Sequence, residues 1–326
     1  MNHFFALSVW RRIAVMAVAA LLASAALAQD RWPARPVRVI VPSSPGGGTD
    51  VFGRILAQAL SEQLKQSFVV DNKPGASGNI GADIVAKAAP DGYTILVASN
   101  SSLGINPVLL QRMPYDADRD LAPVSRGVMA PMVLVATPAT GWKRLKDMAE
   151  AGKKNPEKFF YGSAGVGSPP YIGMRMIEDA MGVEFMHVPY KGVAPAYQDL
   201  LAGHLQFMYT DLATIDQYIK AGKVVVLAVN EKTSLLPNAP TLQDEGLNVR
   251  AWTSFSIMAP GKTPPAIIKK LSEEIARAFH DPAVARHLEQ QALIPVFDTP
   301  ETFAAELRKE REHWGQFIKR KNITAD

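Results

Sequence analysis

Residues 37–64 read VRVIVPSSPGGGTDVFGRILAQALSEQL. The first five are mostly β-branched, which is typical of a strand. After the glycines, apolar residues recur at the spacing of one helical face, at Val51, Ile55, Leu56, Ala59 and Leu60. The segment therefore predicts a buried strand, a loop at its carboxyl end and an amphipathic helix from Asp50 to Leu64, which is the repeating unit of α/β sheets.

The same alternation continues along the chain in two series. The first series adds strands at 68–70 and 94–98 and a helix at 80–88. The second series is expected to contain strands at 133–135, 159–161, 185–188, 205–209 and 224–229 and helices at 145–154, 171–181, 194–202 and 215–221. Alternation of this kind favours parallel strands joined by crossover helices.

The C-terminal part is expected to return to the first series. It starts with a strand at 255–259 and continues, from Pro264-Pro265, with two long amphipathic helices that end near Lys321. We therefore predict a two-lobed α/β fold with a ligand cleft between the lobes. The first lobe is expected to contain 29–132 and 254–326, and the second 133–253. Two crossings of the chain between the lobes permit hinge closure on a ligand.

The N-terminus has the pattern of a secretory signal peptide. Arg11 and Arg12 precede an apolar run of about 15 residues, which is shorter than the roughly 20 that a membrane-spanning helix needs. Ala26-Leu27-Ala28 supplies the small residues of a cleavage site, so we expect cleavage after Ala28 and an exported mature protein. The alternative is that the run is retained as a membrane anchor.

Composition argues against several kinds of partner. Removal of residues 1–28 takes two arginines from a net charge of +4, which leaves about +2. A charge this close to neutral does not indicate nucleic acid or an anionic membrane surface as a partner. The chain has no cysteine, so an exported form must be stabilised by its core without disulfides.

The loop at 42–50 is the strongest candidate for a binding site. It lies at the carboxyl end of a strand, where open α/β sheets bind ligands. Its glycines allow close approach, and unpaired N–H groups at the start of the next helix favour a carboxylate or a phosphate. The alternative is a plain connection in which Thr49 or Asp50 caps the helix. The candidate ligand-binding residues are Ser43, Ser44, Gly46, Gly47, Gly48 and Thr49.

A second Gly/Ser-rich loop, at 162–170, lies between a strand and a helix of the second series. We expect it to be a second anion site, so that one carboxylate lies between two helix N-termini. An ordinary turn before a helix that starts with proline is the alternative. The candidate residues are Ser163, Ala164, Gly167 and Ser168.

Polar residues follow two further strands. Asp211 comes after the strand at 205–209 and before a helix, so it is either an N-cap or an acceptor in the cleft for an amine, a hydroxyl or a protonated acid. Ser99 and Asn100 begin a polar cluster that ends at Ser102 and follows the strand at 94–98. We expect these two residues to line the cleft.

The sequence patterns of common enzymes and cofactor sites are missing. The chain has no cysteine nucleophile, no G-x-S-x-G elbow and no H-E-x-x-H pair, and its histidines lack metal-site spacing with carboxylates. The glycine-rich loop has neither the Lys-Ser/Thr of a Walker loop nor G-x-G-x-x-G spacing. We therefore expect no catalytic residues, no metal and no cofactor.

Several motifs, in one order over essentially the whole mature chain, resemble one family. They are VIVP at 39–42 with GGGTD at 46–50, NKPGASGNIG at 72–81, APDGYT at 89–94, HVPYKG at 187–192 and APGKTPP at 259–265. The family is the solute receptors of tripartite tricarboxylate transporters, also called the Bug receptors. The resemblance implies a periplasmic, two-domain Venus flytrap fold of the periplasmic-binding-protein kind.

The resemblance also implies a function. It indicates a receptor that captures a di- or tricarboxylate, an acidic amino acid or an aromatic acid for the permease subunits of a tripartite transporter. The loops at 43–49 and 163–168 would hold the carboxylate, and Asp211 would help to select the ligand. Ser43-Ser44 replaces the aromatic residue and proline usual in the family, which makes this rim smaller and more polar.

Three other functions remain open at this point. They are a receptor for a sensor kinase, an exported α/β hydrolase, and a structural module whose cleft is unused. Turnover assays would reveal a hydrolase, and stabilisation by a ligand would separate a working receptor from an unused cleft. We expect the protein to act as a monomer.

Overall fold

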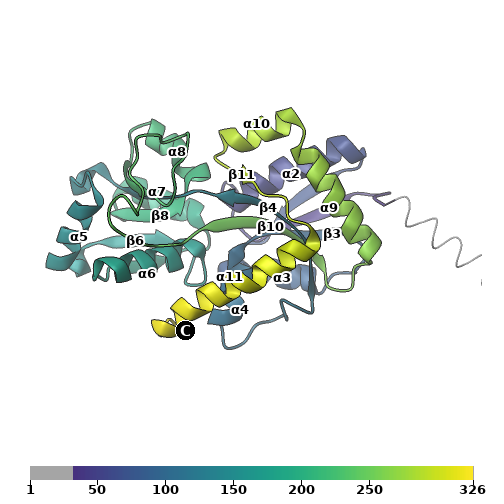
Figure 1. Ribbon diagram of the computed structural model, residues 1–326, viewed down its shortest axis with the longest axis horizontal. Helices are drawn as coiled ribbons and strands as arrows, with labels where there is room; N and C mark the ends of the chain where they lie inside the picture. Colours follow the sequence, from purple (N-terminus) through teal and green to yellow (C-terminus); the bar gives the residue numbers. More distant parts are fainter. Residues whose placement is uncertain (1–31, 326) are drawn as a thin grey trace, which may run out of the picture.

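The computed structural model describes residues 32–325 and has two lobes, each built on one β-sheet (Figure 1). The first-lobe sheet has the order β11-β4-β10-β3-β1-β2, and the second-lobe sheet has the order β7-β6-β8-β5-β9. The predicted two-lobed α/β fold is confirmed. The expected signal peptide, with cleavage after Ala28, lies outside the described residues.

The strands have the following bounds. Those of the first lobe are β1 (Val37–Val41), β2 (Phe68–Asn72), β3 (Thr94–Ser99), β4 (Leu121–Ala130), β10 (Thr253–Pro260) and β11 (Ile294–Pro295). Those of the second lobe are β5 (Met132–Ala136), β6 (Phe160–Ser163), β7 (Met186–Pro189), β8 (Phe207–Asp211) and β9 (Val225–Val229).

Helices cover both faces of the first sheet because β1 is apolar on both. Val37, Val39 and Val41 face one core, and Ile40 faces the other. The first core is closed by α2 (Gly48–Leu64), α9 (Pro265–Phe279) and α10 (Pro282–Gln290). The second is closed by α3 (Asn79–Ala86) and the first half of α11 (Pro300–Arg320).

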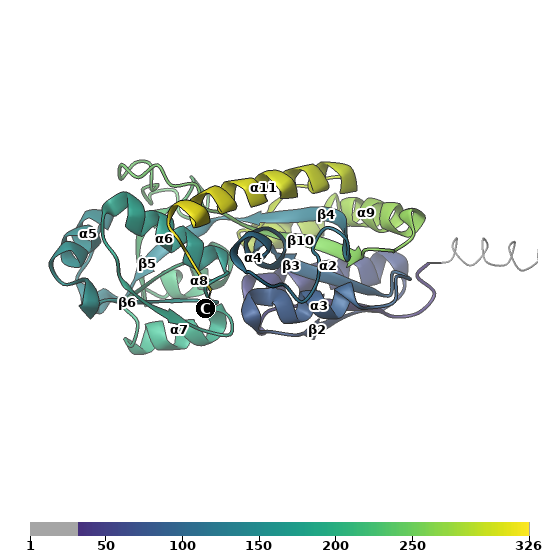
Figure 2. The ribbon, with the colours of Figure 1, turned by 90° about the horizontal axis from the view of Figure 1, so that it is seen from below.

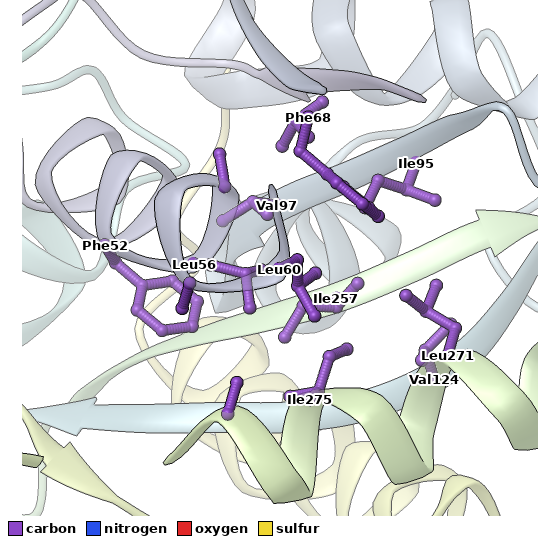
Figure 3. Close-up of a cluster of buried hydrophobic side chains, with 14 of the residues drawn as sticks. Phe52, Leu56, Leu60, Phe68, Ile95, Val97, Val124, Ile257, Leu271 and Ile275 are labelled. Atoms are coloured by element: carbon purple, nitrogen blue, oxygen red, sulfur yellow. The ribbon is translucent and has the colours of Figure 1, made fainter. Parts of the chain in front are cut away.

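The periodic face of α2 supplies much of the first core. Phe52, Leu56 and Leu60 are fully buried and point toward Ile257 of β10 and Ile275 of α9 (Figure 3). Burial of each such side chain contributes about 1.5–3 kcal/mol. This packing fixes α2 on the sheet, and with it the position of the glycine-rich loop that precedes the helix.

The second sheet is also covered on both faces. Met132 and Leu134 of β5 face α5 (Leu145–Lys154) and α6 (Pro169–Met181). Val133 and Val135 face α7 (Val193–Ala202) and α8 (Leu212–Lys220). The predicted helix at 145–154 has these same bounds in the structure, and those at 171–181, 194–202 and 215–221 begin one to three residues earlier.

The structure corrects three expectations about the elements. Both sheets are mixed, because β10 pairs antiparallel with β3 and β4, and β5 pairs antiparallel with β8 and β9. The ten-residue strand β4 was not expected, since Pro123, Arg126 and Gly127 interrupt its apolar pattern. The C-terminal part has three helices instead of two, since His280 and Asp281 separate α9 from α10.

The chain changes lobe at two places. Only Pro131 separates β4 from β5, and the return to the first sheet starts at Thr253 of β10. A further link comes from α11, which runs along one side of the molecule over both lobes (Figure 2). Its Phe303 and Leu307 lie in a first-lobe core, whereas Trp314 and Phe317 lie in a core that residues of both lobes form.

Candidate functional site

A pocket between the lobes is lined by residues of both and has an empty volume of about 650 Å³, part of it open to solvent. The first lobe contributes Gly48 and Thr49 at the start of α2. The second contributes Gly192 and Val193 at the start of α7. The positive ends of two helices therefore face one space.

The start of α2 presents backbone N–H groups to the pocket. Gly47 is the N-cap, and Gly48 and Thr49 are the first two helical residues, both buried. N–H groups in the first turn of a helix have no carbonyl within the helix to bond. Together with the helix dipole, they make this end of α2 a site that can receive an anion.

Asp50 holds this loop in shape. Its carboxylate accepts hydrogen bonds from the Gly46 N–H and from Arg54, both at 2.9 Å, and from Asn72 at 2.8 Å. Burial alone would raise the pKa of Asp50, but the hydrogen bonds from Arg54, Gly46 and Asn72 together lower it. The alternative in which Thr49 or Asp50 is the N-cap is not what the structure has, because Gly47 takes that position.

The helix after the second Gly/Ser-rich loop lacks the predicted donors. Helix α6 begins with Pro169-Pro170, and proline has no N–H. The next N–H, of Tyr171, donates to the hydroxyl of the N-cap Ser168 at 3.4 Å. The Ser168 hydroxyl in turn donates to the Gly165 carbonyl at 2.6 Å. The first turn of α6 therefore offers no free N–H group in its first three residues, and the second anion site expected in this loop stays a prediction.

The second lobe presents a helix start at α7 instead. Gly192 is its N-cap, with φ of 142°, and packs against Ser44 of the first lobe. A Cβ on Gly47 would lie 3.6 Å from Cγ2 of Val193, so the two helix starts lie opposite each other across a narrow gap. The sequence feature that could have predicted this helix start is a single glycine, Gly192, directly before a helical pattern.

Asp211 ends β8 and lies in the wall of the pocket. It is the N-cap of α8. Oδ1 accepts a hydrogen bond from the Thr214 hydroxyl at 3.0 Å. Burial raises the pKa of Asp211, and the bond from Thr214 acts in the opposite direction.

Eight of the thirteen predicted site residues lie in the lining of the pocket. They are Ser43, Gly47, Gly48, Thr49, Ser99, Ala164, Ser168 and Asp211. They come from loops that are far apart in the sequence and belong to both lobes. The structure therefore brings together the two Gly/Ser-rich loops, the end of β3 and the end of β8.

The other five predicted residues lie outside the lining. Ser44 packs against Gly192, and the Gly46 N–H is bonded to Asp50. The Asn100 amide donates a hydrogen bond to the carbonyl of Trp252, the residue before β10, at 3.3 Å.

The last two of these five belong to the second Gly/Ser-rich loop. The Ser163 hydroxyl lies 2.7 Å from Nε2 of His187, a histidine whose pKa burial lowers to about 4. The Ser101 hydroxyl of the first lobe lies 2.7 Å from the Gly167 carbonyl and 2.6 Å from the Ser77 carbonyl, so these two acceptors share its single proton. These contacts shape the loop and hold the lobes together.

Sequence reasoning missed part of the lining. Ser101 was placed in the polar cluster but not chosen, and the segment from Gly75 to Gly78 was noted only as a family motif. The unassigned lining residues are Pro42, Gly75, Ser77, Gly78, Ser101, Pro169, Pro170, Lys191, Gly192, Val193, Thr253 and Phe255. Most are small or apolar, and such side chains carry no chemical signal of their own.

Within residues 32–325, no cluster of three or more His, Asp or Glu side chains has the geometry of a metal site. Among the same residues, no helix combines the length and the apolar character needed to cross a membrane. The polar groups of the pocket are therefore backbone N–H groups, hydroxyls, Asp211 and the exposed Lys191. Such a set can bind and orient a small anion.

Residues 52–323 match the model of a protein family that is described as the tripartite tricarboxylate transporter family receptor. The chain belongs to this family. Its members are periplasmic solute receptors and not enzymes. The resemblance that the motifs indicated is therefore confirmed.

Two relatives show how far the similarity extends. The chain is 33% identical over 324 residues to a protein in the tcbD-tcbE intergenic region of Pseudomonas sp. strain P51, covering 97% of this chain and 96% of the relative. It is 33% identical over 300 residues to protein BugT of Bordetella pertussis, covering 91% of this chain and 92% of BugT.

Two solved structures of similar proteins contain carboxylates. Rpa4515 of R. palustris with adipate has a TM-score of 0.87 at 30% identity, covering 90% of this chain and 99% of that protein. MatC from Rhodopseudomonas palustris with bound malate has a TM-score of 0.84 at 27% identity, covering 88% of this chain and 100% of MatC.

Proposed function

We propose that this receptor captures a small carboxylate in the periplasm and delivers it to the membrane subunits of a tripartite transporter. The observation that carries the proposal is the pair of helix starts, α2 and α7, that face one pocket between two lobes. Free N–H groups at positive helix ends bind a carboxylate without a basic side chain. The lobes can close around it through the crossings at Pro131 and Thr253.

The similar proteins support the class of ligand. One was solved with adipate and another with malate, both dicarboxylates. The small and polar wall around Ser43, Ser99 and Ser101 suits the oxygens of such an acid. We assign the carboxylate to the N–H groups of Gly48 and Thr49.

A thermal-shift screen tests the proposal. The mature protein is heated with malate, adipate, succinate, citrate, glutamate and benzoate in turn. A ligand at about 100 times its Kd adds roughly 2.7 kcal/mol to the free energy of unfolding, which raises the melting temperature by several degrees. A shift with one acid class names the class. If no acid shifts the melting temperature, the proposal fails.

Uptake measurements test the transport role. A strain that lacks this protein should lose uptake of the acid found in the screen, and the wild-type gene should restore it. If uptake is unchanged while a transcriptional response to the acid disappears, the protein serves a sensor kinase instead. Recovery of the mature chain from the periplasmic fraction, beginning at Gln29, checks the expected cleavage after Ala28.

A further inference from the structure

Asp211 is a buried acid without a basic partner among residues 32–325. It is 5% exposed and lines the pocket. The side-chain hydrogen bond that it makes comes from Thr214, and burial is the main influence on its pKa. A carboxylate in this position is sensitive to any second charge that enters the pocket.

Three hydroxyl groups are aligned behind Asp211. The Tyr197 hydroxyl lies 2.6 Å from that of Thr210 and 2.5 Å from that of Thr214. Because Thr214 gives its single proton to Asp211, Tyr197 must donate to Thr214, and Thr210 to Tyr197. All three donors are directed toward the carboxylate, and the bond from Thr214 acts against burial, which raises the pKa of Asp211 overall.

The charged groups on neighbouring elements do not neutralise Asp211. Lys191, which precedes α7, lines the pocket but is exposed, so solvent screens its charge. Tyr197 of α7 stays neutral, because burial raises its pKa. The charged side chains nearest along α2 and α8 form ion pairs of their own, Asp50 with Arg54 and Asp216 with Lys220. The lining residues of β10, Thr253 and Phe255, are uncharged.

The carboxylate of Asp211 lies directly beside the start of α2. A Cβ on Gly48 would be 2.7 Å from its Oδ1. A ligand carboxylate bound to the N–H groups of Gly48 and Thr49 would therefore bring a second negative charge close to Asp211 in a buried pocket. Two carboxylates in such a site do not both remain ionised.

We propose that Asp211 takes up one proton from solvent when a carboxylate binds at the start of α2, and then donates a hydrogen bond to an oxygen of that ligand. The inference rests on the proposed function and adds a regulation of the same site by pH. The proton forms an O–H bond on Asp211, and no other group changes its charge. The pocket then prefers a carboxylate with a second acceptor oxygen near Asp211.

Calorimetric titration in buffers with different ionisation enthalpies counts the protons taken up per ligand. The probe is the acid of the screening panel, from malate to benzoate, that gives the largest thermal shift. At a pH above the pKa of Asp211 in the empty pocket and below its pKa in the complex, uptake should approach one proton per ligand. In that window the affinity should fall about tenfold for each pH unit, because one proton binds with each ligand.

Two variants locate the proton. Asp211→Asn should bind the same probe without proton uptake and without the tenfold fall in affinity for each pH unit. Glu310→Gln is the matched control, since burial raises the pKa of Glu310 to about 7 but its side chain lies outside the pocket lining. This control should keep the uptake of the wild type.

The outcomes separate this inference from the proposed function. If no acid of the panel binds, the proposed function fails and the inference fails with it. If an acid binds to the wild type with no proton uptake across the pH range, only the inference is overturned. Tight binding of glutamate without proton uptake would also overturn only the inference, because the ammonium group of glutamate would then pair with ionised Asp211. Uptake that persists in Asp211→Asn also overturns it.

Discussion

The two Gly/Ser-rich loops, 43–49 and 163–168, look alike in sequence but meet the pocket differently. Each joins a strand to a helix, and each contributes to the lining. The first leads into Gly48-Thr49, whose N–H groups are free to bind a ligand. The second leads into Pro169-Pro170, which has none. We propose that the N–H groups of the first two helical residues, present in Gly48-Thr49 and absent from Pro169-Pro170, decide which loop can hold an anion.

The second loop has a different role, which is contact between the lobes. Its Gly167 carbonyl shares the hydroxyl proton of Ser101 with the Ser77 carbonyl, and Gly165 packs against Ser77. We propose that the first loop binds the ligand and that the second holds the lobes together. Three substitutions test this division, and we order them by their expected effect on affinity.

Gly48→Val should have the largest effect. A Cβ at this position would lie 2.7 Å from Oδ1 of Asp211 and 2.8 Å from Phe255, so the start of α2 must shift. Loss of one or two hydrogen bonds to a charged ligand is worth about 3 kcal/mol, or roughly a 100-fold loss of affinity. Calorimetry measures the affinity, and circular dichroism checks that the fold is kept.

Gly315→Ala is the control for this substitution. Gly315 lies within α11, and a Cβ there would have ordinary contacts with Val108 at 3.6 Å or more. Affinity should be unchanged, and stability should rise by about 0.5–1 kcal/mol because alanine favours a helix more than glycine does. If Gly48→Val binds as tightly as Gly315→Ala, the first loop does not hold the carboxylate.

Ser101→Ala should have an intermediate effect. Its hydroxyl lies 2.7 Å from the Gly167 carbonyl across the gap between the lobes, and it shares its proton with the Ser77 carbonyl at 2.6 Å. Loss of a neutral hydrogen bond costs about 1 kcal/mol, which reduces affinity about fivefold if the bond exists only in the closed form. Ser102→Ala is the matched control, since the Ser102 hydroxyl is buried with no hydrogen-bond partner. Equal affinities for the two variants would contradict the closing role of Ser101.

Ser168→Ala should have the smallest effect on affinity, less than about twofold. The Ser168 hydroxyl is engaged within its own loop, with Gly165 and Tyr171. Loss of this N-cap should instead cost about 1 kcal/mol of stability and lower the melting temperature by about 2–4 °C. If Ser168→Ala loses affinity tenfold while its melting temperature is unchanged, the second loop does bind the anion.

Local patterns in the sequence were sufficient for the elements of the fold. The strand at 37–41 and the helix at 145–154 have the predicted bounds, because apolar periodicity and the flanking glycines and prolines act over a few residues. The direction of β10 was not predictable in the same way. Antiparallel pairing with β3 depends on a partner more than 150 residues away, and no period within β10 encodes it.

The site was predictable where a single loop carries the chemistry. Gly47, Gly48 and Thr49 follow from the strand-loop-helix pattern, and all three line the pocket. Gly192 and Val193 were missed because their place opposite α2 arises only when the second lobe packs against the first. Choosing Ser101 over Asn100 required knowing which way each side chain points. That direction depends on the π-helical turn at Ser101–Ile105. No pattern in the sequence predicts this turn.

The path of α11 has a practical consequence for following the movement of the lobes. Trp32, the first described residue, belongs to a core built from first-lobe residues, whereas Ile323, beyond the end of α11, belongs to a core that contains residues of both lobes, such as Ile105 and Leu134. The end of α11 therefore lies where the two lobes meet. Fluorescent proteins attached at the two ends of the folded chain would report any change in the distance between these cores as the lobes move, so the receptor could serve as a genetically encoded sensor for its acid without internal insertion.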